Sequence, residues 1–138
     1  MSDESINQTE KNKEAVRKMY GAAKEADIAF IIALMDPEVE IVRAPGHPVG
    51  GTFRGMAAAG EARRRTNELT GTEGVEIKQV IAEGPDKVLG IMELKGTDAT
   101  GQPWSMPSVE IVHFVDGKIV KIELFTDTAT LHDIAGRK

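Results

Sequence analysis

Two side chains of opposite charge stand out because each lies among apolar residues. Glu110 sits in the middle of the apolar stretch 106–115, Met-Pro-Ser-Val-Glu-Ile-Val-His-Phe-Val. A carboxyl group in apolar surroundings has a raised pKa, which suits a general acid or base near neutral pH. Arg43 follows Val39 and Ile41 at every second position, so the three share one face of a strand. This parity predicts an inward guanidinium that orients a carbonyl or carboxylate; a structural salt bridge or a strand-end arginine reaching solvent is the alternative.

A third candidate is His47, which lies in the turn-rich stretch 44–51, Ala-Pro-Gly-His-Pro-Val-Gly-Gly. Histidine titrates near neutral pH and could assist Glu110 or Arg43 at the mouth of a pocket, or it could be an exposed loop histidine. The chain has three histidines at scattered positions and no cysteine. That composition argues against a zinc site, and we expect neither a metal nor an organic cofactor.

The periodicity of apolar residues changes from helical to alternating along the chain. It predicts a flexible arm over residues 1–9 and one domain over residues 10–138, although Ser5 and Gln8 have capping-box spacing and allow an earlier helix start. An N-cap is expected at Asp27, and Asp36-Pro37 ends the second helix. Helices are expected near 14–26, 28–35 and 56–69, and strands near 39–43, 52–54, 74–83, 87–95, 104–115 and 118–126, followed by a short tail.

Helices early and a long antiparallel meander late predict an α+β fold. We expect a cone of about three N-terminal helices packed on a strongly curved, mainly antiparallel sheet, and the open mouth of such a cone is a natural small-molecule pocket. Residues on the expected inner faces would line it, with core packing as the alternative for each of them. These residues are Met19, Tyr20, Phe30, Leu34, Phe53, Trp104, Met106, Ser108 and Ile122.

The facing of Glu110 depends on the hairpin at Asp116-Gly117. A two-residue loop pairs Glu110 with Glu123, which places like charges side by side. A three-residue loop pairs it with Ile122 and turns it toward the pocket. In that register Val109, Ile111, Ile119 and Phe125 lie on the opposite sheet face. Such an apolar face is normally covered, so we expect a homodimer through it.

Three stretches carry a resemblance to a known superfamily. They are the two-helix opening that runs through Ala26-Asp27 to Asp36-Pro37-Glu38-Val39, the stretch 45–55 ending Gly-Thr-Phe-Arg-Gly, and the Asp-Gly-Lys-Ile hairpin at 116–119. Their order resembles the nuclear-transport-factor-2-like superfold, within it the SnoaL-like and ketosteroid-isomerase-like proteins, over about residues 10–128. The resemblance implies a cystatin-like cone. It also implies chemistry of the isomerase, cyclase, dehydratase or epoxide-hydrolase type, although the superfold also hosts subunits without activity.

The resemblance is incomplete at the positions that carry chemistry. Glu110 falls where ketosteroid isomerases keep a pocket carboxylic acid. Their base position is occupied here by Arg43, and their tyrosine position by Met19, with Tyr20 one step away. The arginine-linked aspartate pair of limonene epoxide hydrolases is not matched either. The familiar steroid proton shuttle is therefore not expected.

Composition restricts the remaining classes. The 138 residues carry 17 basic and 22 acidic side chains, and the acidic balance argues against a nucleic-acid partner. No apolar run approaches the ~20 residues of a membrane helix, and the polar start is not typical of a secretory signal. We expect a cytoplasmic protein without membrane attachment.

Three functions fit these observations, and one of them is a structural partner subunit in which side chains fill the pocket. The first is a cofactor-independent enzyme that performs acid/base chemistry on a small apolar oxygenated ligand, with Glu110 as acid or base, Arg43 as electrostatic partner and His47 as auxiliary group. The second is a non-catalytic ligand-binding or assembly module of the same fold. An ion pair between Arg43 and Glu110 would favour the module, because a paired carboxylate has a lowered pKa and is a poor acid.

Overall fold

The computed structural model describes the backbone of residues 3–24 and 28–137, and the side chains of residues 3–21 and 29–137. The N-cap expected at Asp27 lies outside the described residues. Four helices are described: α1 (Asp3–Lys24), α2 (Ile28–Leu34), α3 (Met56–Thr70) and α4 (Thr128–Ala135). The strands are β1 (Met35–Arg43), β2 (Gly51–Arg54), β3 (Thr72–Glu83), β4 (Lys87–Thr97), β5 (Pro103–Val115) and β6 (Lys118–Thr126).

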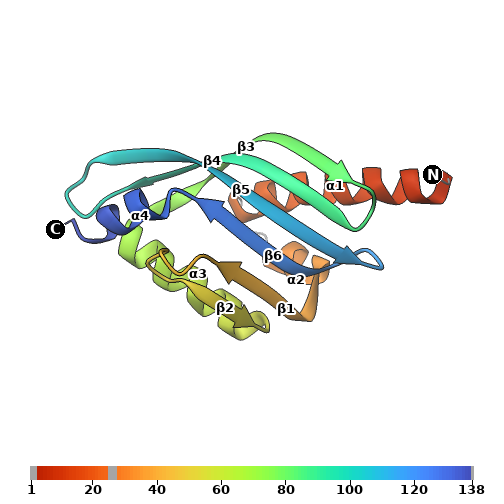
Figure 1. Cartoon of the computed structure of the whole chain (residues 1–138), viewed down its shortest axis with the longest axis horizontal. Helices are drawn as coiled ribbons and strands as arrows, with labels where there is room; N and C mark the ends of the chain where they lie inside the picture. Colours follow the sequence, from red (N-terminus) through yellow and green to blue (C-terminus); the bar gives the residue numbers. More distant parts are fainter. Residues whose placement is uncertain (1–2, 25–27, 138) are drawn as a thin grey trace.

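The six strands form one curved sheet in the order β2-β1-β6-β5-β4-β3 (Figure 1). β1 runs parallel to β6, and the other neighbouring pairs are antiparallel. Helix α1 packs against β3 and β4, while α3 packs against β1, β2 and β3. The predicted α+β fold, with helices on a curved and mainly antiparallel sheet, is confirmed.

The N-terminal boundary differs from the expected flexible arm, because α1 begins at Asp3. Asn12, which is only 3% exposed, explains why this part of the helix is held. Its amide nitrogen donates to the carbonyl oxygen of Pro85 in the β3–β4 turn at 2.6 Å, and its amide oxygen accepts from Gln8 at 2.8 Å. This contact with the β3–β4 turn therefore stabilises the N-terminal part of α1, where the sequence alone predicted a flexible arm.

Both registers expected for the last hairpin are wrong. Val115 pairs with Lys118 across a two-residue turn, but the register shifts by one residue near Phe114, and Glu110 pairs with Leu124. An extra residue in one strand reverses the facing of everything beyond it. Ile119 accordingly lies in the core with no exposed surface, rather than on the outer sheet face as expected.

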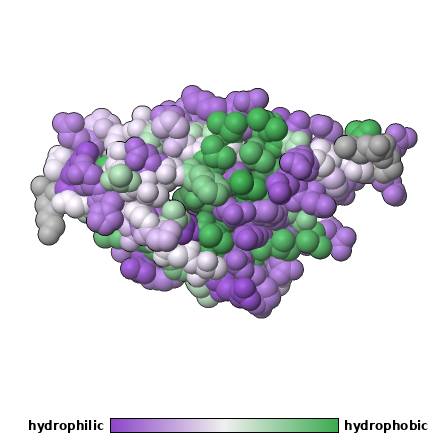
Figure 2. Space-filling model, in the orientation of Figure 1, coloured by the Kyte–Doolittle hydropathy of each residue, from purple (hydrophilic) through white to green (hydrophobic). Residues whose placement is uncertain are grey.

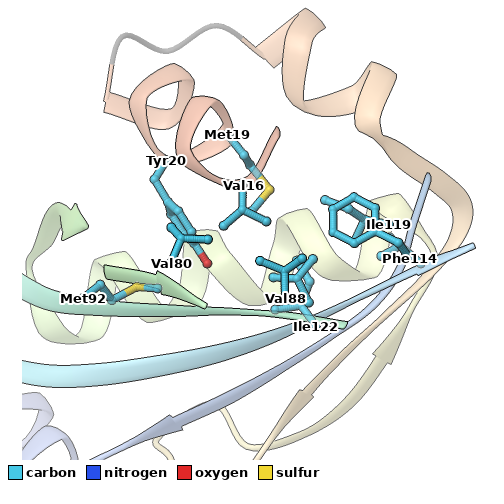
Figure 3. Close-up of a cluster of buried hydrophobic side chains, with 11 residues drawn as sticks. Val16, Met19, Tyr20, Val80, Val88, Met92, Phe114, Ile119 and Ile122 are labelled. Carbon is cyan, nitrogen blue, oxygen red and sulfur yellow. The ribbon is translucent and has the colours of Figure 1, made fainter. Parts of the chain in front are cut away.

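The main hydrophobic core lies between α1 and the concave face of the sheet (Figure 3). Val16, Met19 and Tyr20 project from α1 toward buried strand residues such as Val88 and Ile122. A second cluster lies under α4 and combines Leu94, Met106, Leu131 and Ile134, with Trp104 packed against it. The predicted tail is thus a helix, and it covers one end of the cone.

The outer face of the sheet carries two apolar rows that cross the strands. One row runs Ile81, Leu89, Ile111 and the other runs Ile91, Val109, Phe125. Ile81 is 42% exposed and Phe125 is 52% exposed. We call these six residues the outer apolar face; Figure 2 shows apolar side chains gathered over the central strands.

Within the described residues, no helix combines the length and the apolar composition that crossing a membrane requires.

Candidate functional site

A tyrosine and a carboxylic acid from distant parts of the chain meet inside the cone. The hydroxyl of Tyr20 on α1 donates a hydrogen bond to Oε1 of Glu110 on β5 at 2.8 Å. Tyr20 is 8% exposed, and it points from α1 toward the strands (Figure 3). Glu110 pairs with Leu124 on β6. Because side chains alternate along a strand, Glu110 lies on the same face as buried Val112 and Ser108.

The surroundings of Glu110 favour its neutral form. Burial is the largest influence and raises the pKa of the carboxyl group, while the Tyr20 hydrogen bond and the positive charges of Arg43 and Arg63 act in the opposite direction. The pKa of Tyr20 is raised well above its usual value, first by burial and then by the neighbouring Glu110. Tyr20 therefore remains a neutral donor, and Glu110 can hold or release a proton closer to neutral pH than a surface glutamate.

Gly90 makes room for this pair. It lies on β4 directly opposite Glu110, and the edge of the Tyr20 ring passes over it. A Cβ added at Gly90 would lie 3.3 Å from Cε2 of Tyr20, 3.2 Å from Cε of Met92 and 3.4 Å from Cδ1 of Ile77. An isolated glycine inside a strand is typical of such a close approach, so Gly90 is itself a sequence signal for this site, although it carries no charged or polar side chain.

Gly90→Ala should unfold about 1 kcal/mol more easily than a matched strand variant, because the new methyl group forces Tyr20 or its neighbours to shift. The matched variant is Gly74→Ala on β3, where an added Cβ meets nothing within 4 Å. Urea unfolding of both proteins checks the difference. Equal stability of the two variants would contradict the close packing of Tyr20 over β4.

Arg43 is a second ionisable side chain inside the cone. It ends β1, where it pairs with Gly51 and Leu124. Its Nη1 donates to the carbonyl oxygen of Ala62 at 3.2 Å and to Oγ1 of Thr66 at 2.8 Å, both on α3. Its guanidinium carbon lies 6.0 Å from the centre of the Phe53 ring, a cation–π distance. Arg43 thus lies on the inner strand face, as its alternation with Val39 and Ile41 predicted.

Arg43 and Glu110 influence each other without forming an ion pair. Burial lowers the pKa of Arg43, and the negative charge of Glu110 raises it. Among the described residues, the ion pairs do not include one between these two side chains. The pKa of Glu110 is raised and not lowered. Its carboxyl group therefore keeps its proton to higher pH, as a general acid requires.

His47 is buried, with 4% of its surface exposed. Its Nδ1 accepts a hydrogen bond from the backbone N–H of Val49 at 2.9 Å, so the proton of the neutral ring lies on Nε2. Burial and the nearby positive charge of Arg43 lower the pKa of His47 to about 4. Near neutral pH it is an uncharged neighbour of Arg43 that also shapes the β1–β2 loop, and the idea of an exposed loop histidine is wrong.

Six of the remaining residues that were expected around a ligand lie in four different surroundings. Met19 and Ile122 belong to the core beside Tyr20, and Phe53 lies near Arg43. The hydroxyl group of Ser108 donates to the carbonyl oxygen of Phe125 at 3.4 Å. Phe30 and Leu34 border a surface hollow between α1 and α2, together with Lys11, Glu14, Ala15 and Lys18.

Trp104 and Met106 are not brought to Glu110. The indole N–H of Trp104 donates to the carbonyl oxygen of Thr70 at 2.8 Å, and its ring covers Gly96, where a Cβ would lie 2.5 Å from Cζ2. Met106 belongs to the cluster under α4. The structure therefore corrects the expectation that Trp104 forms a pocket wall beside the acid.

His, Asp and Glu side chains do not gather in groups of three or more that could hold a metal ion, as far as the described residues extend. The polar groups that do converge can donate and accept hydrogen bonds, move a proton at Glu110 and stabilise negative charge at Arg43.

Helices packed on a curved six-stranded sheet are the architecture of the NTF2-like or cystatin-like class of folds. The family model described as SnoaL-like domain matches residues 16–122, and the chain belongs to this family. A comparison with curated proteins found no match.

Solved structures similar to this chain cover nearly all of it. TerC, co-crystallised with polyporic acid, shares 26% identity at a TM-score of 0.79, covering 91% of this chain and 98% of TerC. An NTF2-like protein from Burkholderia thailandensis E264 shares 25% identity at a TM-score of 0.79, with coverage of 91% and 98%. A putative SnoaL-like polyketide cyclase from Jannaschia sp. CCS1 shares 20% identity at a TM-score of 0.67, covering 92% and 93%, and shows the fold alone.

Proposed function

We propose that this protein is a small-molecule-binding enzyme that performs acid/base chemistry, without metal or organic cofactor, on an apolar substrate carrying an oxygen function. The observation that carries the proposal is the hydrogen bond from Tyr20 to Glu110, 2.8 Å long, inside the cone. It holds a carboxyl group of raised pKa in one orientation. A positioned acid of this kind is what proton transfer to or from a bound molecule requires.

Each polar group has a distinct task in this proposal. Oε1 of Glu110 accepts from Tyr20, which leaves Oε2 to carry the proton that is given to the substrate. Arg43, on the neighbouring part of the cone, stabilises negative charge that develops on a substrate oxygen. TerC, with 26% identity, was co-crystallised with polyporic acid, which supports a small organic molecule as the ligand.

A non-catalytic binding module of the same fold is the competing function. A carboxylate neutralised by an ion pair would have supported it, because the pair would lower the pKa of Glu110. The raised pKa of Glu110 argues for the enzyme instead.

The test is a screen of cyclic ketones, lactones, epoxides and organic acids, incubated with the protein in D2O and in ¹⁸O-water and followed by mass spectrometry. Proton abstraction introduces deuterium at carbon, and opening of an epoxide or lactone introduces ¹⁸O. Conversion that depends on Glu110 supports the enzyme. Compounds that bind and are returned unchanged would establish the binding module and overturn the catalytic proposal.

We further propose that the protein forms a homodimer through the outer apolar face. Two rows of partly exposed apolar side chains cross four strands there, and an exposed apolar patch of this kind is typical of an interaction surface. Val109 lies in one row between Ile91 and Phe125, so Val109→Asp places a charge inside the contact.

Sedimentation at micromolar concentration should show a dimer for the natural protein and a monomer for Val109→Asp. Ile32→Asp is the matched control, because Ile32 on α2 is 49% exposed but belongs to a different surface. A monomeric natural protein, or equal dissociation of both variants, would contradict this interface.

A further inference from the structure

Arg43 is incompletely hydrogen-bonded inside the cone, and the proposed proton transfer at Glu110 does not account for this. Its two described hydrogen bonds use one nitrogen, Nη1, and both go to uncharged oxygens of Ala62 and Thr66. Its Nε is buried and is the one buried side-chain nitrogen or oxygen, among the described residues, without a hydrogen-bond partner. Leaving a buried charged donor unpaired is costly, so this N–H is suited to receive an acceptor that is not part of the protein.

The charges near Arg43 do not neutralise it. Glu110 is the carboxyl group that acts on it electrostatically, and burial favours the neutral form of that group. His47 is also neutral near pH 7, because burial and Arg43 itself lower its pKa to about 4. Arg63 adds a further positive influence at Glu110. Arg43 is therefore a buried positive charge whose nearest titratable neighbours, Glu110 and His47, are both shifted toward their neutral forms by burial.

An arginine elsewhere in the chain shows the usual arrangement. Arg54 on β2 lies on the surface, with 69% of its side chain exposed, and pairs with Glu40 at 2.8 Å. Arg43 has lost more of its water and has no carboxylate within ion-pair distance among the described side chains. An oxygen anion placed on Arg43 would gain from the low dielectric of the interior and from a charge-assisted hydrogen bond.

We infer that Arg43 binds the ionised oxygen of the ligand, so that this site selects apolar organic acids, such as aryl carboxylates or acidic enols and phenols, over neutral molecules of the same shape. The inference rests on the proposed function and narrows its substrate class. The apolar body of the acid would lie against Phe53 and the neighbouring core residues, since the Phe53 ring already covers the guanidinium at 6.0 Å. The anion is held at Arg43 while Glu110, hydrogen-bonded to Tyr20, remains available for proton transfer.

Matched ligands test the inference by calorimetry at pH 7. The pairs are 2-naphthoate with 2-naphthamide and benzoate with benzamide, which differ by one charge and little in shape. Of the two acids, we expect the one that binds the natural protein more tightly to have a Kd at least about tenfold lower than that of its amide. A charge-assisted hydrogen bond provides a difference of this size. In Arg43→Gln, which removes the charge and the guanidinium, the preference should fall to within about threefold.

Two further variants keep the test decisive. Arg43→Lys retains the charge but not Nε, so it should keep a reduced preference for the acid even if Arg43→Gln folds poorly. Arg54→Gln removes an equal charge from the surface and should leave the preference unchanged. Circular dichroism and thermal unfolding establish that each variant is folded.

Equal affinity for acid and amide in the natural protein, an acid preference that survives in Arg43→Gln, or no binding of any panel acid at millimolar concentration would each overturn the inference. Failure of the proposed function looks different. In that case acids bind in an Arg43-dependent way, yet no compound is converted. Conversion of neutral compounds that depends on Glu110, with no preference for acids, would retain the function and refute the anion site.

Discussion

Glu110→Gln should lower the turnover of any converted compound by about 10²–10⁴-fold while changing its affinity by less than about tenfold. The amide keeps the shape of the side chain and can still accept the hydrogen bond from Tyr20. It cannot release or take up a proton at neutral pH, and positioned acids or bases contribute about this factor to rate. Initial rates under saturating compound, with Kd from calorimetry, separate the two effects.

Glu123→Gln is the matched control for this variant. Glu123 lies on the other face of the sheet, where its Oε1 contacts Nε2 of His113 at 2.6 Å. The Glu123→Gln protein should retain normal turnover. A Glu110→Gln protein that keeps more than about a tenth of the natural rate would show that proton transfer does not pass through this carboxyl group.

The pH dependence of the rate distinguishes a catalytic Glu110 from a merely structural one. If the neutral acid is the active form, the rate falls as pH rises through the pKa of Glu110. The hydrogen bond from Tyr20 lowers that pKa, so Tyr20→Phe should raise it and move the falling limb to higher pH. A limb that stays in place, or that moves to lower pH, would contradict the assignment.

Much of this site follows from strand parity. Arg43 shares a face with Val39 and Ile41, and Glu110 interrupts an apolar stretch; both positions are visible in the sequence because the strand period is two. The order of helices and strands likewise predicts the cone. These features depend on local patterns, which a sequence records directly.

The features that could not be predicted depend on tertiary contacts. Val120 on β6 has no partner on β5, because the register shifts between the pairs Phe114–Ile119 and His113–Lys121. The pairing of β6 with β1 also shifts there, between Met35–Ile119 and Glu40–Lys121, whereas the hairpin geometry of Asp116-Gly117 alone offers two regular registers. Similarly, Trp104 has the parity of a pocket residue, but its hydrogen bond to Thr70 and the cover of α4 place it in a separate cluster.

Burial has opposite consequences for the two titratable groups beside Arg43. It raises the pKa of Glu110, so the folded state binds more protons at that group than the unfolded state, and its contribution to stability decreases as pH rises. It lowers the pKa of His47 to about 4, so the unfolded state binds more protons there at mildly acid pH. The contribution of His47 is complete above about pH 6.5 and is lost as pH falls toward 4.

His47→Asn should therefore remove part of the acid sensitivity of folding. The asparagine side chain can accept from the backbone N–H two residues ahead, which replaces the bond that Nδ1 of His47 accepts from Val49, but it does not titrate. Between pH 7 and pH 4.5 the free energy of unfolding of the natural protein should fall by about 2 kcal/mol more than that of His47→Asn. Urea unfolding at several pH values measures this difference.

His132→Asn, on the exposed side of α4, should retain the natural pH dependence. Parallel curves for the natural protein and His47→Asn would mean that the folded state accommodates a charged His47 next to Arg43, which is incompatible with the electrostatics on which the anion site depends.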